Sequence, residues 1–532
     1  MSIQNISAIA PLMILSGGIV ALMLQVAFFR SHRGALATTL CTLGVAAASC
    51  IYLLHKLPET GHAVTGLLLV DRFSLFLCLL NLFIAVIVSA LGLHYLNARL
   101  ASGSLNVSAG DSYPEEFYIL LLLAVLGGCT LVSASHFASF FLALELISIS
   151  FYPLLAFSVH GDQSPERDKV LSLESGLKYL MTSALATALG LFGIALVFSA
   201  SGSLAMFSVP SHDHLYQAGI VLFFVAIAFK LSLVPFHFWT PDVYQGAPTP
   251  VTALLATLGK GALIAILFKI VHKQQLLELP AIYSFIAVMA AASMIIGNLL
   301  ALRQQNLKRL LAYSSIAHLG YLFVALLLTD SGFGSESVST YLVAYVVTTL
   351  SAFSVVSLVA DSAFSHTPGG SRPLQDPSRD PFQRMYYRGL LWRAPALALC
   401  FGIALLSLAG IPLTLGFIGK FYLFSAGVQG QNWWLLSALI LGSALGLYYY
   451  LGLILDLLQR PGPAEADDTG EQSADFTINA AAFPPAEYRK ASATGHPADI
   501  EKTGWLIVLL LTFLLLGLGI YPSPLINWIN AL

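Results

Sequence analysis

The sequence predicts an all-α polytopic membrane protein with about fourteen transmembrane helices. Of its 532 residues, 57% are hydrophobic and 10% are charged, whereas about 25% of a soluble domain is charged. The mean hydropathy is +0.81. Apolar runs of about 20 residues, each long enough to span a bilayer core as a helix, recur along nearly the whole chain. Because lipid cannot satisfy backbone polar groups, runs of this length indicate helices rather than barrel strands.

The expected spans follow one another with short connections. The first run, Ala8 to Phe29, is long enough to span and has its arginines on the far side, so we do not expect a cleavable signal peptide. The expected ranges, in chain order, are 8–29, 36–54, 73–96, 117–135, 137–158, 172–199, 216–239, 250–272, 280–302, 310–329, 337–361, 395–426, 433–457 and 503–521. We expect five units: spans 1–3 in 1–110, spans 4–8 in 111–275, spans 9–13 in 276–460, a cytoplasmic loop at 461–502 and the last span in 503–532.

The basic residues orient this bundle. If the N-terminus lies outside, the inside loops hold 17 of the 25 lysines and arginines, and the outer loops and helix ends hold four: Lys56, Arg72, Lys269 and Lys273. Positive residues concentrate on the cytoplasmic side of membrane proteins. We therefore expect a multi-pass protein of a bacterial inner membrane with both termini on the periplasmic side. Two inside loops, 362–394 and 460–502, have the composition of disordered or loosely packed segments.

Four lysines remain inside the spans: Lys178, Lys230, Lys260 and Lys420. Glu145, in "FFLALELISIS", lies mid-span as well. A charge at the centre of a membrane helix costs about 2.5–3.5 kcal/mol on insertion scales. Burial also disfavours the charged form of a lysine, which makes these groups candidates for proton exchange.

Structural roles compete with proton transfer for each of these charges. A lysine near a helix end can extend its ammonium to the membrane surface, which suits Lys269 and Lys273. Lys178 has Glu174 four residues earlier, a helical pairing that stabilises without any function. Four lysines and a glutamate in one bundle with few other charges favour the functional interpretation.

The remaining polar residues give weaker signals. His237 and His318 are candidate relays, since the ordinary pKa of histidine is about 6.5, although a single histidine in a helix is more often a core residue. Asp71 and Arg72 are expected to pair at the membrane interface, and Asp361, Asp330 and Glu336 are expected to be solvated at span ends. The five cysteines lie in apolar runs without a C-x-x-C motif, so we expect no disulfide, iron–sulfur cluster or metal site.

Prolines interrupt two spans close to a lysine. Pro235 follows Lys230, and Pro412 precedes Lys420 in "SLAGIPLTLGFIGKFYLF". Proline removes a backbone donor and breaks the helix, so each break predicts a polar, hydrated pocket beside its lysine. The broken spans are the seventh and the twelfth, and broken helices at matching places are typical of inverted repeats. We therefore expect two five-helix repeats, spans 4–8 and 9–13, in opposite orientations.

These motifs resemble the proton-translocating antiporter-like subunits of respiratory complex I, and within them the subunit N type. The resemblance covers roughly residues 70–460. "LLATLGKGA", with Lys260, favours that type over relatives with an "HAATMV"-like run. The segments that carry the resemblance are "LALELISISFYPLLAF" (142–157), "ESGLKYLMTSALATALGLFGIALVF" (174–198), "FKLSLVPFHFWTPDVYQGAPTPVTALLATLGKGA" (229–262), "NLLALRQQNLKRLLAYSSIAHLGYLFVALL" (298–327) and "LLSLAGIPLTLGFIGKFYLF" (405–424).

The resemblance implies a role for each buried charge. Glu145 matches the glutamate of the family's fifth helix, and Lys178 matches the sixth-helix lysine, which we expect to pair with it. Lys230 and Lys260 match the central lysines of the first half, and Lys420 matches the lysine near the exit in the second half. His318, in "YSSIAHLGY", is not shared by all members of the family, so its role stays open.

The resemblance implies a subunit of NADH-quinone oxidoreductase that couples electron transfer to proton pumping. Its partners would be other membrane subunits, the lipid bilayer, protons and water, with no nucleic acid. NADH, FMN, iron–sulfur clusters and quinone are expected in those partners, and no cofactor is expected in this chain. Three alternatives stay open: a subunit of a multisubunit cation/proton antiporter, a subunit of a membrane-bound hydrogenase, and an inert scaffold. We find no nucleophile elbow, metal-ligand cluster or phosphate loop.

Overall fold

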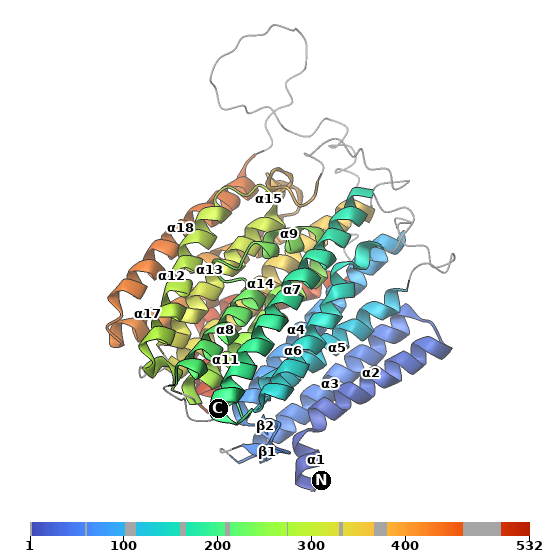
Figure 1. Cartoon of the computed structure of the whole chain (residues 1–532). Coiled ribbons are helices and arrows are strands. Elements are labelled where there is room, and N and C mark those ends of the chain that lie inside the picture. Colours follow the sequence, from blue (N-terminus) through green and yellow to red (C-terminus); the bar gives the residue numbers. More distant parts are fainter. Residues whose placement is uncertain are drawn as a thin grey trace, which may run out of the picture.

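The computed structural model describes residues 3–58, 61–101, 113–159, 166–207, 213–273, 275–328, 334–365, 380–460 and 502–531. In these parts of the chain the helices run side by side in one bundle, accompanied by two short strands (Figure 1). Within the same ranges, thirteen helices are long and apolar enough to cross a membrane. The predicted all-α membrane fold is therefore confirmed. Most of the predicted loop 460–502, part of the loop 362–394, and Asp330 lie outside the described residues.

The N-terminal part forms one side of the bundle. A hairpin pairs His62 with Val70 and covers the end of the bundle near the N-terminus (Figure 1). The elements are α1 (Ile3–Ala8), α2 (Ala10–Phe28), α3 (His32–Lys56), β1 (His62–Val64), β2 (Leu68–Val70) and α4 (Arg72–Ala101).

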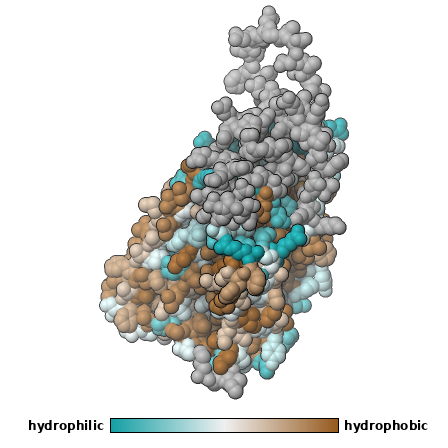
Figure 2. Space-filling view, turned by 90° about the vertical axis from the view of Figure 1, so that its right-hand side faces the viewer, coloured by the Kyte–Doolittle hydropathy of each residue, from teal (hydrophilic) through white to brown (hydrophobic). Residues whose placement is uncertain are grey.

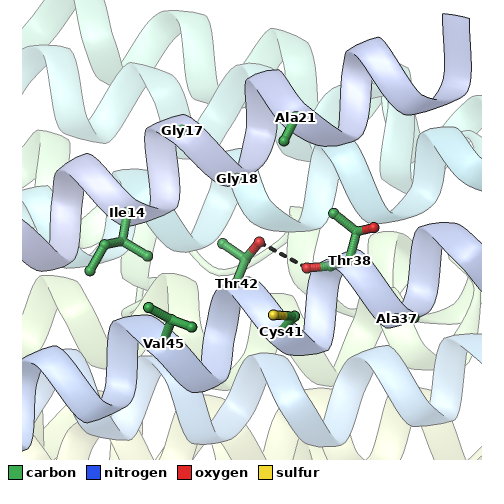
Figure 3. A pocket seen from close by; sticks show the side chains of 9 residues that line it. All are labelled: Ile14, Gly17, Gly18, Ala21, Ala37, Thr38, Cys41, Thr42 and Val45. Atoms are coloured by element: carbon green, nitrogen blue, oxygen red, sulfur yellow. Dashed lines mark hydrogen bonds between the residues drawn. The ribbon is translucent and has the colours of Figure 1, made fainter.

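An open groove of about 500 Å³ lies between α2 and α3 (Figure 3). Small residues make room for it, among them Gly17, Ala21 and Ala37. At Gly18 the two helices touch, because a Cβ there would collide with the side chain of Thr42. The Thr42 hydroxyl donates to the carbonyl oxygen of Thr38 at 2.8 Å, which satisfies it in apolar surroundings. The groove is thus a surface feature of the outermost helix pair.

The next part of the chain contains the first broken helix. Its elements are α5 (Pro114–Val132), α6 (Phe137–Leu155), η2 (Phe157–Val159), α7 (Glu166–Ser201), α8 (His214–Leu231), α9 (Trp239–Gly246), α10 (Thr249–Leu254), the π-helix η3 (Leu255–Gly259) and α11 (Lys260–Lys273). The predicted span 216–239 is therefore broken as expected, with the break between α8 and α9.

Local contacts satisfy the backbone at this first break. Ser232 ends α8 in the left-handed region with φ 64°, and Pro235 follows in the turn. The indole nitrogen of Trp239 donates to the freed carbonyl of Phe229 at 2.9 Å, and the amide of Val234 donates to Ser293 Oγ at 3.0 Å. Groups that proline releases in a membrane helix need such partners, and here neighbouring side chains supply them.

The last part of the chain contains the second broken helix. The twelfth expected span, 395–426, is two helices in the structure, joined by residues 410–414. The elements are η4 (Leu276–Glu278), α12 (Pro280–Ala301), α13 (Leu307–Leu327), α14 (Gly334–Ser365), η6 (Arg384–Tyr387), α15 (Leu390–Arg393), α16 (Pro395–Ala409), α17 (Leu415–Gln429), α18 (Trp433–Leu458), α20 (Lys502–Ile520) and α21 (Ser523–Asn530).

Burial separates central helices from outer ones. The apolar windows of Thr249–Lys273 and Glu336–Ser362 are 100% buried, whereas those of α2 and α7 are 22% and 28% buried. Figure 2 shows hydrophobic residues over the flank of the bundle, as expected of a surface that faces lipid or neighbouring apolar chains. The centre of the molecule therefore consists of α14 and of the span formed by α10, η3 and α11.

The prediction of a loosely packed loop is wrong for residues 380–394. Asn306 and Gln383 form an isolated β-bridge, and Arg384 forms an ion pair with the buried carboxylate of Asp456 on α18. The Gly389 amide donates to the Asp456 carbonyl at 2.8 Å. These contacts fold the segment onto the end of the bundle opposite the two termini (Figure 1). Composition alone could not predict this packing, because the partners of the segment lie far away in the sequence.

Candidate functional site

Glu145 and Lys230 form an ion pair between α6 and α8. Lys230 Nζ lies 3.5 Å from Glu145 Oε1, and the two side chains are 4% and 22% exposed. Lys230 also donates to Ser148 Oγ at 2.7 Å and to Ser183 Oγ at 2.6 Å. Glu145 accepts a hydrogen bond from Thr187 at 2.6 Å. The ammonium therefore has three polar neighbours, of which only Glu145 carries a charge.

The sequence builds this pair from residues on matching helix faces. Ser148 lies one turn after Glu145 on α6, and Thr187 lies one turn after Ser183 on α7, so each couple projects from one side of its helix. Lys230 stands in the last turn of α8, directly before the break. A cation is stabilised there by the negative end of the helix dipole. The position of the break thus helps to hold a charge in the membrane.

The expected pairing of Glu145 with Lys178 is wrong. Lys178 Nζ lies 2.5 Å from Glu174 and 2.6 Å from Asp242 instead, and its side chain is 38% exposed. Arg309 on α13 also binds Asp242, at 2.6 Å. The sequence showed the Glu174 partner through its spacing of four residues. It could not show Asp242, which lies 64 residues later in the chain and reaches Lys178 only because α9 packs against α7.

Asp242 lies between the membrane helices, at the fourth position of α9. Burial works to raise the pKa of its carboxyl group, but the hydrogen bonds from Lys178 and Arg309 outweigh burial and hold the pKa below its usual range. The carboxylate is therefore the ionised centre of a charged cluster at the start of α9. We name this cluster, Glu174, Lys178, Asp242 and Arg309, the α9 cluster.

Lys260 occupies the centre of the bundle. It is 1% exposed. It donates to Ser315 Oγ at 3.0 Å, and its ammonium lies 5.3 Å from the centre of the Tyr244 ring. Ser315 in turn contacts the hydroxyl of Tyr345 at 2.7 Å. The π-helix η3 ends just before Lys260, and such wide turns are frequent at functional sites.

His318 connects two groups of tyrosines beyond Lys260. Its Nδ1 lies 2.8 Å from the hydroxyl of Tyr341, and its Nε2 lies 3.5 Å from that of Tyr450. The ring is 5.7 Å from that of Tyr321. Ser315, the partner of Lys260, stands three residues before His318 on α13 and therefore on the same side of that helix. This arrangement places His318 on a polar line that leads away from Lys260.

Lys420 closes the second helix break. Its ammonium donates to the carbonyls of Leu408 at 3.2 Å and Ala409 at 2.9 Å, two acceptors that the end of α16 leaves free. It also lies 5.2 Å from the centre of the Tyr321 ring. Tyr321 contacts both His318 and Lys420, so this ring joins the two sites. The polar, hydrated pocket expected beside Pro412 stays a prediction; the structure places two backbone carbonyls there as partners of Lys420.

His237 lies in the turn between α8 and α9. It is 3% exposed and its ring stacks on that of Phe238 at 4.4 Å. Tyr313 of α13 lies 6.5 Å away, measured between ring centres. The structure therefore places His237 apart from the ion pair of Lys230, and its relay role remains a prediction.

Two further lysines are buried that we expected near the surface. Lys269 is 4% exposed and binds Asp71 at 2.9 Å and the carbonyl of Val132 at 3.1 Å, so the expectation that it extends to the membrane surface is wrong. The predicted Asp71–Arg72 pair is wrong as well, since Asp71 faces Lys269. Burial works against ionisation of Asp71, but Lys269 and Ser74 hold the pKa of this carboxyl group low.

Lys308, one of the basic residues expected in the inner loops, is 2% exposed. It donates to the carbonyls of Gln245 at 3.1 Å and Ala247 at 2.5 Å, which are the free acceptors at the end of α9. Phe382 lies 4.4 Å from the ammonium on another side. Lys308 therefore fixes the broken segment α9 to α13. The sequence did not predict that Lys308 is buried, because its partner Gln245 lies 63 residues earlier in the chain.

Within the described residues, no group of three histidine, cysteine, aspartate or glutamate side chains is arranged to hold a metal ion. The cysteines that lie close together, Cys78 and Cys129, are linked by a weak contact from the Cys78 thiol to the Cys129 carbonyl at 3.7 Å. The site is therefore a row of ionisable and hydroxyl side chains across the bundle. Such a row can hold and pass protons.

Comparisons with known proteins agree on one family. A family model described as NADH:quinone oxidoreductase/Mrp antiporter, TM, matches residues 134–446. The chain is 37% identical to NADH-quinone oxidoreductase subunit N of Ectopseudomonas mendocina (strain ymp), over 99% of this chain and 96% of that protein. It is 40% identical to NADH-quinone oxidoreductase subunit N of Methylococcus capsulatus, over 87% of this chain and 88% of that protein.

Solved structures give the same result for the fold. A chain of respiratory complex I from Thermus thermophilus with bound aureothin matches with a TM-score of 0.73 and 33% identity, over 98% of this chain and 99% of that one. An archaeal membrane-bound sulfane sulfur reductase matches at 0.76 with 19% identity, over 99% and 96%. The Mrp complex from Dietzia sp. DQ12-45-1b matches at 0.75 with 19% identity, over 100% and 97%. At 19% identity these last two show the fold alone.

Proposed function

Because the chain belongs to the NADH:quinone oxidoreductase/Mrp antiporter family of membrane proteins, we propose that it is a proton-translocating membrane-arm subunit of NADH-quinone oxidoreductase. The two curated relatives, 37% and 40% identical, carry the name subunit N of that complex. The chain takes part in the enzyme as a translocase subunit and supplies no redox site of its own. NADH, FMN, iron–sulfur clusters and quinone belong to the partner subunits in this proposal.

The observation that carries the mechanism is the ion pair of Lys230 and Glu145. Ser148 and Ser183 hold the ammonium in place but carry no charge, so Glu145 decides how stable the charged form is. A change elsewhere in the complex that moves Glu145 away makes Lys230 release its proton. The return of Glu145 loads it again.

The energies are of the required size. Two unit charges about 4 Å apart interact by about 4 kcal/mol at an effective dielectric constant of about 20. A proton moved against 100 mV needs about 2.3 kcal/mol. The interaction energy of one such pair is therefore larger than the free energy needed to move one proton against 100 mV, even after partial screening by solvent.

The released proton passes to Lys260 and onward to Lys420 in this proposal. Support comes from Ser315, Tyr345 and His318, which line the interval, and from Tyr321, which contacts both His318 and Lys420. The α9 cluster, with Lys178, faces outward on α7 and receives the electrostatic signal from a neighbouring subunit. His237 and His318 serve as relays, and their roles need separate tests.

The two broken helices support a division into inverted repeats at 111–275 and 276–460. Each repeat has a lysine at a helix break, Lys230 at the end of α8 and Lys420 in α17. We place both termini on the periplasmic side of a bacterial inner membrane, because 17 of the 25 lysines and arginines fall in loops predicted on the opposite side.

Lys230→Ala tests this function. In the assembled complex, reconstituted in vesicles, the variant is expected to lose proton pumping and to reduce quinone more slowly, because the ammonium that Glu145 controls is gone. The measurement is the ratio of protons moved to NADH oxidised. An unchanged ratio at normal turnover would refute the proposal.

The alternative is a subunit of a multisubunit cation/proton antiporter or of a membrane-bound hydrogenase. Its support is the fold match to the Mrp complex and to the sulfane sulfur reductase, at 19% identity in each case. Sodium flux that depends on this chain and needs no electron donor would favour this alternative. The higher identity to subunit N relatives, 37% and 40%, favours the main proposal.

A further inference from the structure

A buried histidine–carboxylate pair lies outside the row of lysines. His94 Nδ1 on α4 is 3.3 Å from Asp361 Oδ2 on α14, and the side chains are 9% and 3% exposed. The Ser357 hydroxyl, one turn earlier on α14, donates to the same oxygen at 3.2 Å. We expected Asp361 to be solvated at a span end, and that expectation is wrong. Neither residue is part of the mechanism above.

Charges of both signs surround this pair. Lys308 is close enough to interact electrostatically with Asp361, Asp168, Asp380 and Arg99. Arg99 lies 3.9 Å from Asp168. The imidazole of His94 therefore stands among three carboxylates and two basic side chains, and the nearest carboxylate, Asp361, can hold a proton together with it.

The other elements around the pair add few charges. The segment before α15 brings Asp380 and Tyr387, and α15 brings Arg393; Tyr387 interacts electrostatically with both charged groups. α10 has no ionisable residue, and α7 contributes Asp168. Histidine is the residue type whose ordinary pKa lies near neutral pH, so the imidazole of His94 is the group of the pair that can accept a proton there.

A buried hydroxyl points to water on the outer side of the pair. Tyr387 is 1% exposed and interacts electrostatically with Asp361. Within the described residues, its hydroxyl has no hydrogen-bond partner. Buried polar groups without a protein partner are commonly completed by internal water. Such a water would link Asp361 to the surface of the bundle.

α14 also leads inward from the pair toward Lys260, past the ring of Phe353. Phe353 lies one turn below Ser357 on α14, and its ring is 6.1 Å from that of Tyr244. Tyr244 stands 5.3 Å from the ammonium of Lys260 and interacts with Ser315, the hydroxyl to which Lys260 donates. The eight residues from Asp361 to Phe353 cover about 12 Å, whereas half of the bilayer core is about 15 Å. This stretch of α14 therefore leads from the pair to Tyr244, the neighbour of Lys260.

We propose that His94 and Asp361 form a proton-uptake site, which binds protons from the side of the membrane opposite the termini and delivers them toward Lys260. The inference rests on the proposed function, because it assigns the entry point of the pumped proton. The imidazole accepts a proton from water, and the carboxylate holds it while the next group inward is loaded. No bond other than those to the proton changes.

The test uses His94→Gln and Asp361→Asn in the intact complex in vesicles. Both variants keep the size and hydrogen-bonding capacity of the side chain but cannot titrate. Proton transfer by a positioned side chain contributes about 10²–10⁴-fold; because water substitutes in part, we expect about a tenfold slower coupled NADH oxidation near pH 8.5, where protons are scarce. Near pH 6 the rate is expected to stay within about twofold of the unchanged protein, with the same ratio of protons to NADH.

Glu116→Gln is the matched control, since it removes an exposed carboxylate at the start of α5 that is not among the charges around the pair. It is expected to leave the pH profile unchanged. The double exchange His94→Asp with Asp361→His is expected to restore the profile if the two positions act as one site. A loss that is equal at both pH values, or no loss, overturns the inference and identifies the pair as a structural tie between α4 and α14.

The two proposals fail separately. If Lys230→Ala abolishes pumping while Asp361→Asn behaves like the unchanged protein at every pH, the proposed function stands and the uptake site is refuted. If His94→Gln lowers the yield of assembled complex, the uptake site is judged from Asp361→Asn alone, by its rate of NADH oxidation per assembled complex at the two pH values.

Discussion

At the scale of single residues, the carboxylate of Glu145 is the group that controls Lys230. We predict that Glu145→Gln lowers the rate of proton pumping more than tenfold, since an interaction of about 4 kcal/mol is lost and each ~1.4 kcal/mol corresponds to a factor of ten. Glu174→Gln is the matched comparison: it is expected to have a smaller effect because Lys178 keeps Asp242 at 2.6 Å. Pumping in vesicles measures both, and equal losses would contradict the assignment.

Asp242 gives a prediction about pH. Its folded-state pKa lies below the usual value, so its ion pairs contribute stability above about pH 4, and that contribution is lost as the pH falls through the folded pKa. Between about pH 5 and 8 the carboxylate stays ionised. Asp242→Asn is therefore expected to lower thermal stability by a constant amount across this range, on the order of 1 kcal/mol because the cluster is partly exposed. A stability difference that varies over this range would contradict the prediction.

The sequence identified the charged residues of the site but not their partners. Glu145, Lys230, Lys260 and Lys420 stand out because a charge in an apolar run is costly and rare. Their partners depend on which helix faces meet, and a spacing rule reaches only neighbours within one helix. Glu174 could be found in this way as a partner of Lys178, whereas Asp242 could not.

At the scale of elements, the helix breaks can be predicted from the prolines. The groups that bind the carbonyls freed at each break cannot. The break near Pro412 was expected, but the contact of Lys420 with the freed carbonyls of Leu408 and Ala409 depends on how α17 packs against α16. Likewise, the composition of 380–394 suggested a loose loop, and the ion pair of Arg384 with Asp456 orders it. Distant partners decided both outcomes.

Gly410 offers a test of this closure. It has φ +83°, and a Cβ there would meet Lys420 Cδ at 2.7 Å. Gly410→Ala is therefore expected to displace the ammonium from its carbonyls and to reduce pumping at least as far as Lys420→Met does. At Gly402 on α16, an added Cβ would have no neighbour within 4 Å, so Gly402→Ala should pump normally. Normal pumping by Gly410→Ala would show that the carbonyl contacts of Lys420 have no role.

At the scale of the whole molecule, the hydropathy pattern predicted the bundle because each span can be recognised as an apolar run without knowledge of its neighbours. Which helices become central could not be predicted in this way. α14 carries Thr348, Ser351, Ser354, Ser357 and Asp361 and is nevertheless fully buried. The hydroxyls and the carboxylate of this span give no sign in the sequence that the helix is central. It is stable inside because hydroxyls bond back to their own helix, as Ser354 does to the Leu350 carbonyl at 2.7 Å.

The orientation of the bundle is the last prediction. Figure 1 marks both chain ends at one end of the bundle, and α15 lies at the other. Arg99, Lys308, Arg309, Arg384 and Arg388 belong to the α15 end, and positive residues favour the cytoplasmic side. The two ends of α20 can report this, because Tyr521 lies beyond one end with 64% exposure and Thr503 lies at the other.

In a chain whose exposed Cys41 is replaced by Ser, Tyr521→Cys is expected to react with a membrane-impermeant maleimide added to intact cells. Thr503→Cys should react only after the membrane is opened, because it lies at the cytoplasmic end of the same helix. The two variants share one helix, so differences in expression or folding affect both alike. Labelling of Thr503→Cys from outside would show that the bundle has the opposite orientation. His94 and Asp361 would then face the periplasm and not the cytoplasm.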